Sequence, residues 1–492
     1  MIENGTFELV QLPPGSKAIG SRWVFHVKRN ADGSIERYKA RVVAQGFSQR
    51  PGFDYTETFA PTPKWAALRA ILALAAIEDL ELESVDISSA YLNGDLEEEV
   101  YMRQPEGFVE KGNDWYWRLI KSLYGLKQAG RCWHKKLNEV LESIGFKRAI
   151  CEHSIWIYQR GDERVIIPVF IDDITIAARS KEAVQRVKTD LKAHFKLRDL
   201  GPTSFLLGVE VKRNRPNRTL TLSQRQYVLD ILERFGLADC NSVTTPLDPS
   251  VRLSSAHSPT TPEDIGEMSS IPYLQAVGAL MYLAIATRPD IAYSVGVLAR
   301  FSKNPGLQHW KAVKHLFRYL KGTLDYKLTY SGLHPSSELF TAYTDADHGG
   351  NPDNGRSTSG YIVKMGNGAV SWSSCLQSIV ALSTTEAEYV AATSAGQEIL
   401  WFRNLFTEFG YNMDAPSTLH IDNQSALSVA KNPEHHGRMK HLDLRLYWLR
   451  DEVEKGSIRM VHLATNLMPA DILTKALSRV KVGEMVEMLG LG

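Results

Sequence analysis

The chain has 492 residues, of which 43% are hydrophobic and 23% are charged, and its formal net charge is +1. This composition is that of an ordinary globular protein with two to four domains, and it excludes a repeat or low-complexity protein. The four cysteines have no paired spacing, which argues against a zinc site or a disulfide framework. No apolar run is long enough to cross a bilayer and the first residues form no signal region, so we expect an intracellular protein that is not secreted and contacts no membrane.

Basic residues gather in three stretches of this nearly neutral chain. Lys and Arg outnumber Asp and Glu in residues 1–50, 181–235 and 300–330. Such stretches suit a protein that contacts a phosphate backbone at several places. Solvated helix faces would give the same pattern, so both explanations stay open.

The first part of the chain mixes short strands with helices. Residues 23–28 and 38–43 are predicted strands, joined by a turn over 31–34. Helices are predicted around 66–80 and 132–144. An alternating strand that begins at Leu82 then brings Asp86 to its end.

Two adjacent acids, Asp172 and Asp173, stand between two apolar runs within residues 165–178. The pattern predicts a strand, a tight turn and a second strand, with both acids at the tip. Two such charges about 4 Å apart repel by roughly 4 kcal/mol at an effective dielectric of about 20, and a divalent cation would reverse this cost. Asp86 is a candidate third ligand. Simple turn chemistry for the pair, and a strand-end or capping role for Asp86, are the alternatives.

The middle of the chain is predicted to be largely helical. A basic amphipathic helix over 182–195 precedes a strand over 205–211 and a helix over 226–235. Residues 241–272 are rich in Ser, Thr and Pro, which is typical of a linker or a wrapping loop. Residues 273–323 are predicted helical. Their basic face carries Lys311, Lys314, Arg318 and Lys321.

From about residue 336, strands alternate with helices, and four acids stand at strand ends or helix starts. Asp345 and Asp422 each end a predicted strand. Glu386 is the third residue of a helix that Ser383 caps, and Asp471 opens the last helix. A capping box explains Glu386 equally well, and the helix dipole explains Asp471.

Several segments resemble the polymerase of copia-type LTR retrotransposons. Phe170-Ile171-Asp172-Asp173 is similar to the catalytic box of reverse transcriptases, and Val85-Asp86 through Tyr91-Leu92 to their first catalytic motif. The supporting runs are RYKARVVAQGF at 37–47, ETFAPT at 57–62, LYGLKQA at 123–129 and RYLKGT at 318–323. The resemblance covers nearly the whole chain and names the reverse transcriptase–ribonuclease H region of a Pol polyprotein.

The resemblance implies an α+β right-hand polymerase with fingers, palm and thumb, followed by an α/β ribonuclease H-like domain. We expect fingers, palm and the start of the thumb in 1–240, a linker and helical connection region in 241–335, and the ribonuclease H-like domain in 336–480. It also implies two Mg²⁺ ions at each site, for which Mn²⁺ would substitute. The implied metal ligands and catalytic residues are Asp86, Asp172 and Asp173 in the polymerase, and Asp345, Glu386, Asp422 and Asp471 in the ribonuclease H.

The same resemblance assigns residues that contact substrate. Lys39 and Arg41 would reach the incoming triphosphate, Tyr91 would lie under the deoxyribose as a sugar gate, and Gln128 is a further substrate-binding residue. Leu206, Leu207 and Gly208 correspond to the primer grip, which holds the 3′ end of the primer.

The implied function is RNA-directed DNA synthesis followed by degradation of the RNA in the hybrid, by two-metal phosphoryl transfer at both sites. The implied partners are an RNA template, a DNA primer, the RNA–DNA hybrid and deoxynucleoside triphosphates, with integrase or capsid of the same element as protein partners. The implied location is a cytoplasmic virus-like particle or the nucleus. The alternative is a catalytically silent remnant, a truncated copy or fragment that only binds nucleic acid or element proteins.

The chain departs from the family pattern at a few positions. Phe170 replaces a tyrosine in the catalytic box, Gly130 stands where proline is common, and His348 where tryptophan is common. The loop before Asp471 lacks the mobile histidine of many ribonucleases H, for which His462 is the nearest substitute. We therefore expect intact acids at both sites and slower product release at the second.

Overall fold

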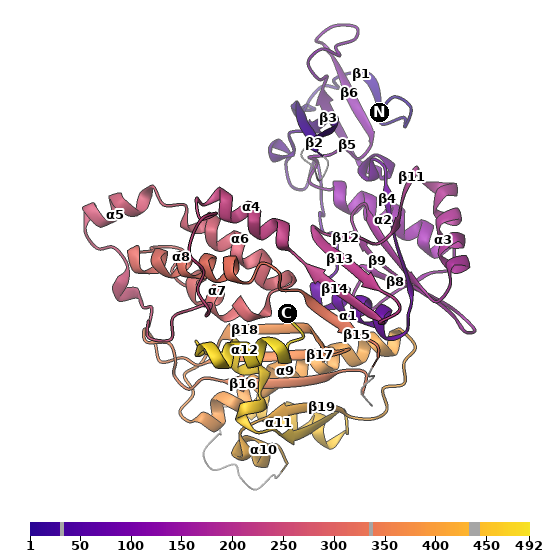
Figure 1. The fold of residues 1–492 in the computed structure, drawn as a ribbon. Coiled ribbons are helices and arrows are strands. Elements are labelled where there is room, and N and C mark those ends of the chain that lie inside the picture. Colours follow the sequence, from indigo (N-terminus) through magenta and orange to yellow (C-terminus); the bar gives the residue numbers. More distant parts are fainter. Residues whose placement is uncertain (30–33, 334–337, 432–442) are drawn as a thin grey trace. The chain divides into compact units, whose positions relative to one another are not determined.

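The computed structural model describes residues 1–29, 34–333, 338–431 and 443–492 of the chain. The chain folds into two compact units, each built from two separate stretches of sequence. Unit 1 consists of Met1–Pro63 and Glu81–Pro202, and unit 2 of Lys64–Leu80 and Thr203–Gly492. Both units contain helices and sheets (Figure 1), so the predicted mixed α and β fold class is confirmed. The predicted domains 1–240, 241–335 and 336–480 are functional divisions and stay a prediction.

The core of unit 1 is an antiparallel sheet of six strands. In sheet order the strands are β11 (Leu197–Pro202), β4 (Glu81–Ile87), β10 (Asp173–Ala178), β9 (Glu163–Phe170), β8 (Ile155–Arg160) and β7 (Lys147–Arg148). Apolar side chains of α2 (Ala129–Ser143) and α3 (Lys181–His194) join those of the strands in one buried core. The hairpin predicted over 165–178 is therefore confirmed as β9 and β10, in the centre of this sheet.

Two smaller sheets complete unit 1. One contains β1 (Phe7–Gln11), β6 (Trp115–Lys121) and β5 (Asp95–Arg103) in that order. The other is a two-stranded ribbon of β2 (Ser21–Arg29) and β3 (Ile35–Ala44), which confirms the predicted strands. The turn predicted between them lies largely outside the described residues. Because alternate residues of a strand point to the same side, Lys39 and Arg41 share one face of the ribbon.

Unit 2 holds two further sheets. A four-stranded antiparallel sheet contains β12 (Phe205–Leu206), β13 (Val209–Asn214), β14 (Thr219–Ser223) and β15 (Leu328–Ser331). A five-stranded sheet contains, in order, β18 (Gly368–Leu376), β17 (Thr358–Met365), β16 (Thr341–Ala346), β19 (Ser417–Ile421) and β20 (Ile458–His462). β19 runs parallel to both of its neighbours, so the carboxyl ends of β16, β19 and β20 meet at one edge of the sheet.

The remaining helices of unit 2 fall into two groups: those within residues 225–322 lie together to one side, and those within residues 384–488 lie around the five-stranded sheet (Figure 1). They are α4 (Arg225–Arg234), α5 (Pro262–Ser269), α6 (Tyr273–Ala286), α7 (Ala292–Ala299), α8 (Leu307–Gly322), α9 (Thr384–Glu408), α10 (Gln424–Lys431), α11 (Asp443–Glu454) and α12 (Arg479–Met488). The predicted linker thus contains α5. Part of the predicted basic face of α8 has a structural role, since Arg318 donates to the carbonyl of Asn241 and Lys321 to that of Ala238.

An apolar helix that the sequence placed beside the palm belongs to unit 2. In α1 (Trp65–Ile77) every residue from 66 to 76 is buried, and the helix packs against β15 and β18. Arg69 is the one charged residue in this run. Its guanidinium donates to backbone carbonyls, among them that of Val370 at 2.7 Å, and lies 3.7 Å from the ring centroid of Trp372. A helix that is apolar all round is expected to be buried, but its sequence does not say against which sheet.

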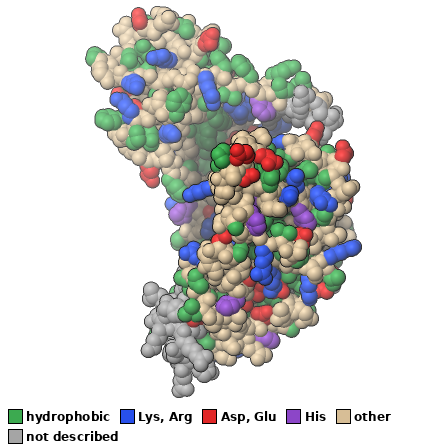
Figure 2. Space-filling view, turned by 90° about the vertical axis from the view of Figure 1, so that its left-hand side faces the viewer, with side chains coloured by type: hydrophobic (Ala, Val, Ile, Leu, Met, Phe, Trp, Pro, Cys, Tyr) green, Lys and Arg blue, Asp and Glu red, His purple; other side chains and the backbone are tan. Residues whose placement is uncertain are grey.

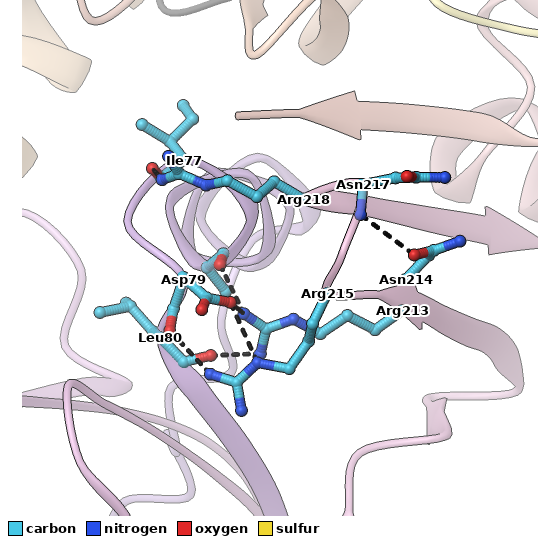
Figure 3. Close-up of polar contacts among 9 residues, drawn as sticks. Ile77, Asp79, Leu80, Arg213, Asn214, Arg215, Asn217 and Arg218 are labelled. Atoms are coloured by element: carbon cyan, nitrogen blue, oxygen red, sulfur yellow. Dashed lines mark hydrogen bonds and ion pairs between the residues drawn. The ribbon is translucent and has the colours of Figure 1, made fainter. Parts of the chain in front are cut away.

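Three arginines of the β13–β14 hairpin hold the carboxyl end of α1 (Figure 3). Arg213 Nη2 lies 2.7 Å from Asp79 Oδ1 and 2.9 Å from the carbonyl oxygen of Ala75, and its Nη1 donates to the carbonyl of Leu80. Arg215 Nε lies 3.0 Å from the same Asp79 oxygen. Arg218 donates to the carbonyl of Ile77. The last carbonyls of a helix have no partner within the helix, so these guanidinium groups cap it and complement its dipole.

Arg213→Met is therefore expected to lower the free energy of unfolding of the chain by about 1–3 kcal/mol, because it removes the ion pair with Asp79 and the guanidinium bonds to the carbonyls of Ala75 and Leu80. Urea unfolding followed by tryptophan fluorescence measures this loss. Lys212→Met is the matched control: it removes a charge from the same strand, where the lysine side chain is 66% exposed and pairs with Glu210. The control is expected to stay within about 0.5 kcal/mol of wild type. Equal effects of the two substitutions would contradict the capping role.

No single helix among the described residues is both long and apolar enough to cross a membrane; only the bent pair α5 and α6, taken together, meets the length and composition required. On the face drawn in Figure 2, the Lys and Arg side chains of the described residues are spread over the surface instead of forming one patch.

Candidate active sites

The first candidate site lies in unit 1, where strand β4 meets the β9–β10 hairpin. The register pairs Asp86 with Asp173 and Phe170 with Asp173, which brings the end of β4 to the tip of the hairpin. The N–H of Ile87 donates to the carbonyl of Asp172 at 3.0 Å. The acids that the sequence placed in two separate segments thus lie side by side.

The turn that carries the acids has an unusual backbone. Ile171 has a φ of +58°, which is costly for a β-branched residue. The indole N–H of Trp133 in α2 donates to the carbonyl of Ile171 at 2.8 Å and so helps to hold this conformation. Strained residues of this kind persist only where the surroundings stabilise them, and they gather at functional sites.

A cavity of about 420 Å³ opens beside these acids within unit 1. Its lining includes Asp86 and Asp172 together with the cationic residues Arg37, Lys39, Arg41 and Arg198 and the ring of Tyr124. Burial, and then the carboxylate of Asp86, raise the pKa of Asp172, while Arg41 and Lys39 oppose the rise. Carboxylates and cationic side chains therefore share one cavity, as a site for a polyphosphate and its cations would require.

Asp173 is placed differently from its neighbour. It is exposed and lies outside this cavity, although it stands opposite Asp86 in the register. Adjacent strand residues point to opposite faces, so only one acid of the pair can face Asp86 squarely. In the cavity that acid is Asp172.

The second candidate site lies in unit 2, at the edge of the five-stranded sheet. Asp345 is near the end of β16, Asp422 follows the last residue of β19, and Glu388 projects from α9, which packs on β16. Carboxylate oxygens of these three residues all lie within 4.8 Å of one another. Parallel neighbouring strands explain the meeting of the two aspartates, since their carboxyl ends share one edge.

Without a cation, it is energetically unfavourable to bury these carboxylates in their charged form. Burial, followed by the charges of Asp345 and Asp422, raises the pKa of Glu388 to about 9. Burial and Asp345 also raise the pKa of Asp422. Glu388 is 6% exposed, and its Oε2 has no hydrogen-bond partner among the described residues. A buried oxygen without a partner beside two further carboxylates fits a divalent cation that prefers oxygen ligands.

Glu386, which the sequence assigned to this cluster, has a local role instead. Its N–H donates to Ser383 Oγ at 3.2 Å, and its carboxylate accepts from the N–H of Leu382. Two residues along a helix correspond to a turn of about 200°, so Glu386 and Glu388 point to nearly opposite sides. The structure therefore contradicts the prediction of Glu386 as a ligand in this cluster. The carboxylate of Glu388 joins Asp345 and Asp422 instead.

Asp471 completes the cluster from a short 3₁₀ helix, Pro469–Leu473. Burial and the nearby Asp345 raise its pKa to about 7, and Lys475 opposes this rise. Lys475 Nζ lies 3.0 Å from Asp471 Oδ1 and 3.5 Å from Asp345 Oδ2. The sequence had not singled out this lysine, whose position four residues after Asp471 is the only hint of the contact.

His462, the predicted substitute for a mobile histidine, stands close to the cluster. Its Nε2 lies 3.1 Å from the carbonyl oxygen of Asp422. The hydroxyl of Thr465 donates to Asp422 Oδ2 at 3.0 Å, which helps to orient this carboxylate.

Comparison with known families identifies the chain. A family model described as "Reverse transcriptase (RNA-dependent DNA polymerase)" matches residues 4–249. The chain belongs to the reverse transcriptase family. The match includes the cavity acids Asp86 and Asp172, and it confirms the family to which the sequence motifs pointed.

Long relatives give the same result. The retrovirus-related Pol polyprotein from transposon TNT 1-94 of Nicotiana tabacum is 42% identical over 99% of this chain and 37% of its own length. That from transposon RE2 of Arabidopsis thaliana is 40% identical over 100% of this chain and 33% of its own length. The predicted resemblance to copia-type Pol polyproteins is thus confirmed, and the chain spans about a third of the length of these relatives. Among solved structures, the foamy viral protease–reverse transcriptase in complex with dsDNA has a TM-score of 0.45 and 12% identity, covering 93% of this chain and 79% of that chain.

The predicted substrate-binding residues lie in several environments. Lys39 and Arg41 line the cavity with the acids, and their contact with a triphosphate stays a prediction. The half-buried ring of Tyr91 lies 4.7 Å from that of Tyr124. Burial, and then the charge of Asp172, raise the pKa of Tyr91. Gln128 is fully buried outside the cavity: it accepts from Gln49 at 3.0 Å and donates to the carbonyl of Asp54 at 2.8 Å. In this structure Gln128 therefore supports the loop at 49–54.

The predicted primer-grip residues form a tight turn in unit 2. Leu206 ends β12 and is buried, Leu207 and Gly208 have φ values of +49° and +80°, and β13 begins at the next residue. The hydroxyl of Tyr282 donates to the carbonyl of Leu207 at 2.5 Å. A Cβ at Gly208 would come within 2.9 Å of this hydroxyl, so the turn favours glycine for space as well as for φ. Its role in holding a primer stays a prediction.

Proposed function

We propose that this chain is an RNA-directed DNA polymerase with an associated ribonuclease H activity. The observation that carries the polymerase is the cavity shared by Asp86, Asp172, Lys39 and Arg41 in a member of the reverse transcriptase family. The observation that carries the ribonuclease is the buried cluster of Asp345, Glu388 and Asp422. Its substrates would be an RNA template, a DNA primer and deoxynucleoside triphosphates, and then the RNA–DNA hybrid.

In the polymerase cavity the chain would bind and orient a nucleotide. Asp86 and Asp172 would hold Mg²⁺, or Mn²⁺ in its place, which supplies positive charge against the attacking and leaving oxygens of the phosphoryl transfer. Lys39 and Arg41 would bind the triphosphate through charge-assisted hydrogen bonds. Tyr91, fixed against Tyr124, would exclude a ribose 2′-hydroxyl. The cationic wall and the acidic pair would thus align the triphosphate with the primer end.

At the second site, Asp345, Glu388, Asp422 and Asp471 would hold Mg²⁺, which lowers the pKa of a bound water and neutralises phosphate charge. The chain itself would position the scissile RNA strand at the sheet edge where these acids meet. We place both activities inside the cell, in a virus-like particle or the nucleus, with integrase or capsid of the same element as protein partners.

Primer extension tests the first activity. Purified protein is incubated with a homopolymer RNA template, a complementary DNA primer, Mg²⁺ or Mn²⁺ and the matching deoxynucleotide, and extended products are measured on a gel. A labelled preformed hybrid tests the second activity. We expect both products. A folded protein that binds the hybrid but gives neither product would favour the silent remnant.

A further inference from the structure

A lysine side chain stands within the second acidic cluster. Lys475 Nζ is 3.0 Å from Asp471 Oδ1 and 3.5 Å from Asp345 Oδ2. The two acids are 8% and 2% exposed, whereas the lysine side chain is 40% exposed. Its ammonium group therefore contacts two buried carboxylates, while the lysine side chain as a whole stays partly exposed.

The cluster has two sides that differ in what occupies them. On one side the carboxylates of Asp345, Glu388 and Asp422 converge within 4.8 Å, and Glu388 Oε2 has no hydrogen-bond partner among the described residues. On the other side the ammonium of Lys475 lies between Asp345 and Asp471, and the hydroxyl of Thr474 also donates to Asp345 Oδ2. One side is thus open to a cation and the other already holds one.

We propose that Lys475 is a built-in counter-cation that makes the two cation positions of this site unequal. The first divalent cation binds at Asp345, Glu388 and Asp422. A second binds between Asp345 and Asp471 only after the ammonium has left that position. This inference deepens the proposed ribonuclease function and rests on it, because it assumes that the cluster binds divalent cations.

The physical reason is competition for the same oxygens. An ammonium group and a divalent cation cannot both contact Asp471 and Asp345 closely without repelling each other. A lysine is a compact charge on a flexible stem, and this one is partly exposed, so it can move away at a modest cost. Asp345 is shared between the two sides, and the ammonium therefore competes most directly with the second cation.

Isothermal titration of the full chain with MgCl₂ tests the proposal. The background carries Asp86→Asn and Asp172→Asn, so that the polymerase acids do not contribute cation sites. Lys475→Met and Lys475→Gln remove the charge, and Lys475→Arg keeps a positive charge. Lys481→Met is the matched control, since that side chain is 38% exposed and pairs with Glu484 at 2.7 Å, away from the cluster.

We expect the unsubstituted Lys475 protein to bind one Mg²⁺ tightly and a second weakly. Lys475→Met and Lys475→Gln are expected to tighten the second binding step by about tenfold and to leave the first nearly unchanged. Lys475→Arg and Lys481→Met are expected to keep both steps. Manganese binding followed by electron paramagnetic resonance counts the same ions independently.

Two other results would overturn the inference. An unchanged second step in both charge-removing variants would show that Lys475 only braces the 3₁₀ helix, even though the site binds cations. If Glu388→Gln removes no Mg²⁺ binding from the protein that keeps Lys475, the proposed ribonuclease site itself is wrong. The first step therefore reports on the function, and the second step on the role of Lys475.

Discussion

Glu388→Gln is expected to abolish cleavage of the RNA strand of a hybrid, by more than about 100-fold, while Glu386→Gln leaves cleavage close to wild type. Glu388 lies with Asp345 and Asp422 in a buried cluster, and in the proposed function its charge helps to hold a divalent cation. The carboxylate of Glu386 accepts from the N–H of Leu382 at the start of the same helix. A glutamine at 386 keeps a side-chain oxygen for that bond, so its cost in stability is about 1 kcal/mol or less.

The two variants also differ in how Mg²⁺ changes their stability. Because burial raises the pKa of Glu388 to about 9, the metal-free protein holds this side chain protonated at pH 7, and glutamine mimics that state. We therefore expect equal melting temperatures for wild type and Glu388→Gln without metal. Added Mg²⁺ should raise the melting temperature of wild type and Glu386→Gln more than that of Glu388→Gln. Normal cleavage by Glu388→Gln would make Glu386 a candidate ligand again and would contradict the assignment of Glu388 to the cation site.

The error at Glu386 shows what local sequence patterns can and cannot predict. Ser383 and Glu386 form a helix-start pattern within four residues, and the structure contains the bond from the Glu386 N–H to Ser383. Such a pattern needs no knowledge of the rest of the fold. Which of two glutamates two residues apart faces β16 depends on how α9 packs on the sheet, and only the three-dimensional structure supplies this.

The polymerase acids were predictable for a different reason. Asp172 lies in the turn between β9 and β10 and Asp86 near the end of β4, and short local motifs mark both positions in the sequence. Lys39 and Arg41 came from the resemblance to the family, and the alternation of β3 puts both on one face. Gln128 has no periodic pattern to fix it, and its burial beside Gln49 depends on contacts between segments almost eighty residues apart.

The boundary between the two units was also hidden from the sequence. Helix α1 follows the fingers strands in the chain, yet it packs on β15 and β18. Its apolar residues predict burial, and its last residue is Ile77. The arginines that cap it come from a hairpin more than a hundred residues later, so the sequence of α1 does not predict these contacts.

Asp172→Asn is expected to reduce primer extension by more than about 100-fold and to leave cleavage of a preformed hybrid unchanged. Asp172 lines the same cavity as Asp86, Lys39 and Arg41, and its charge is needed beside Asp86 to hold a cation there. Asp86→Asn is expected to have the same effect. Asp173→Asn is the internal control: this acid is exposed and lies outside the cavity, so a smaller loss is expected.

Measurements of stability show whether a variant has lost only a cation ligand or has lost its fold. Burial and the charge of Asp86 raise the pKa of Asp172, so in the metal-free protein its ionised form opposes folding. The unfavourable contribution grows as the pH rises from the ordinary aspartate pKa to the raised one, and asparagine removes it. At pH 7 without metal, Asp172→Asn should therefore be at least as stable as wild type, and the gain should vanish at a pH below the ordinary aspartate pKa. Primer extension at the wild-type rate by this stable variant would remove Asp172 from the active site, and a melting temperature well below wild type would contradict the electrostatic account of the cavity.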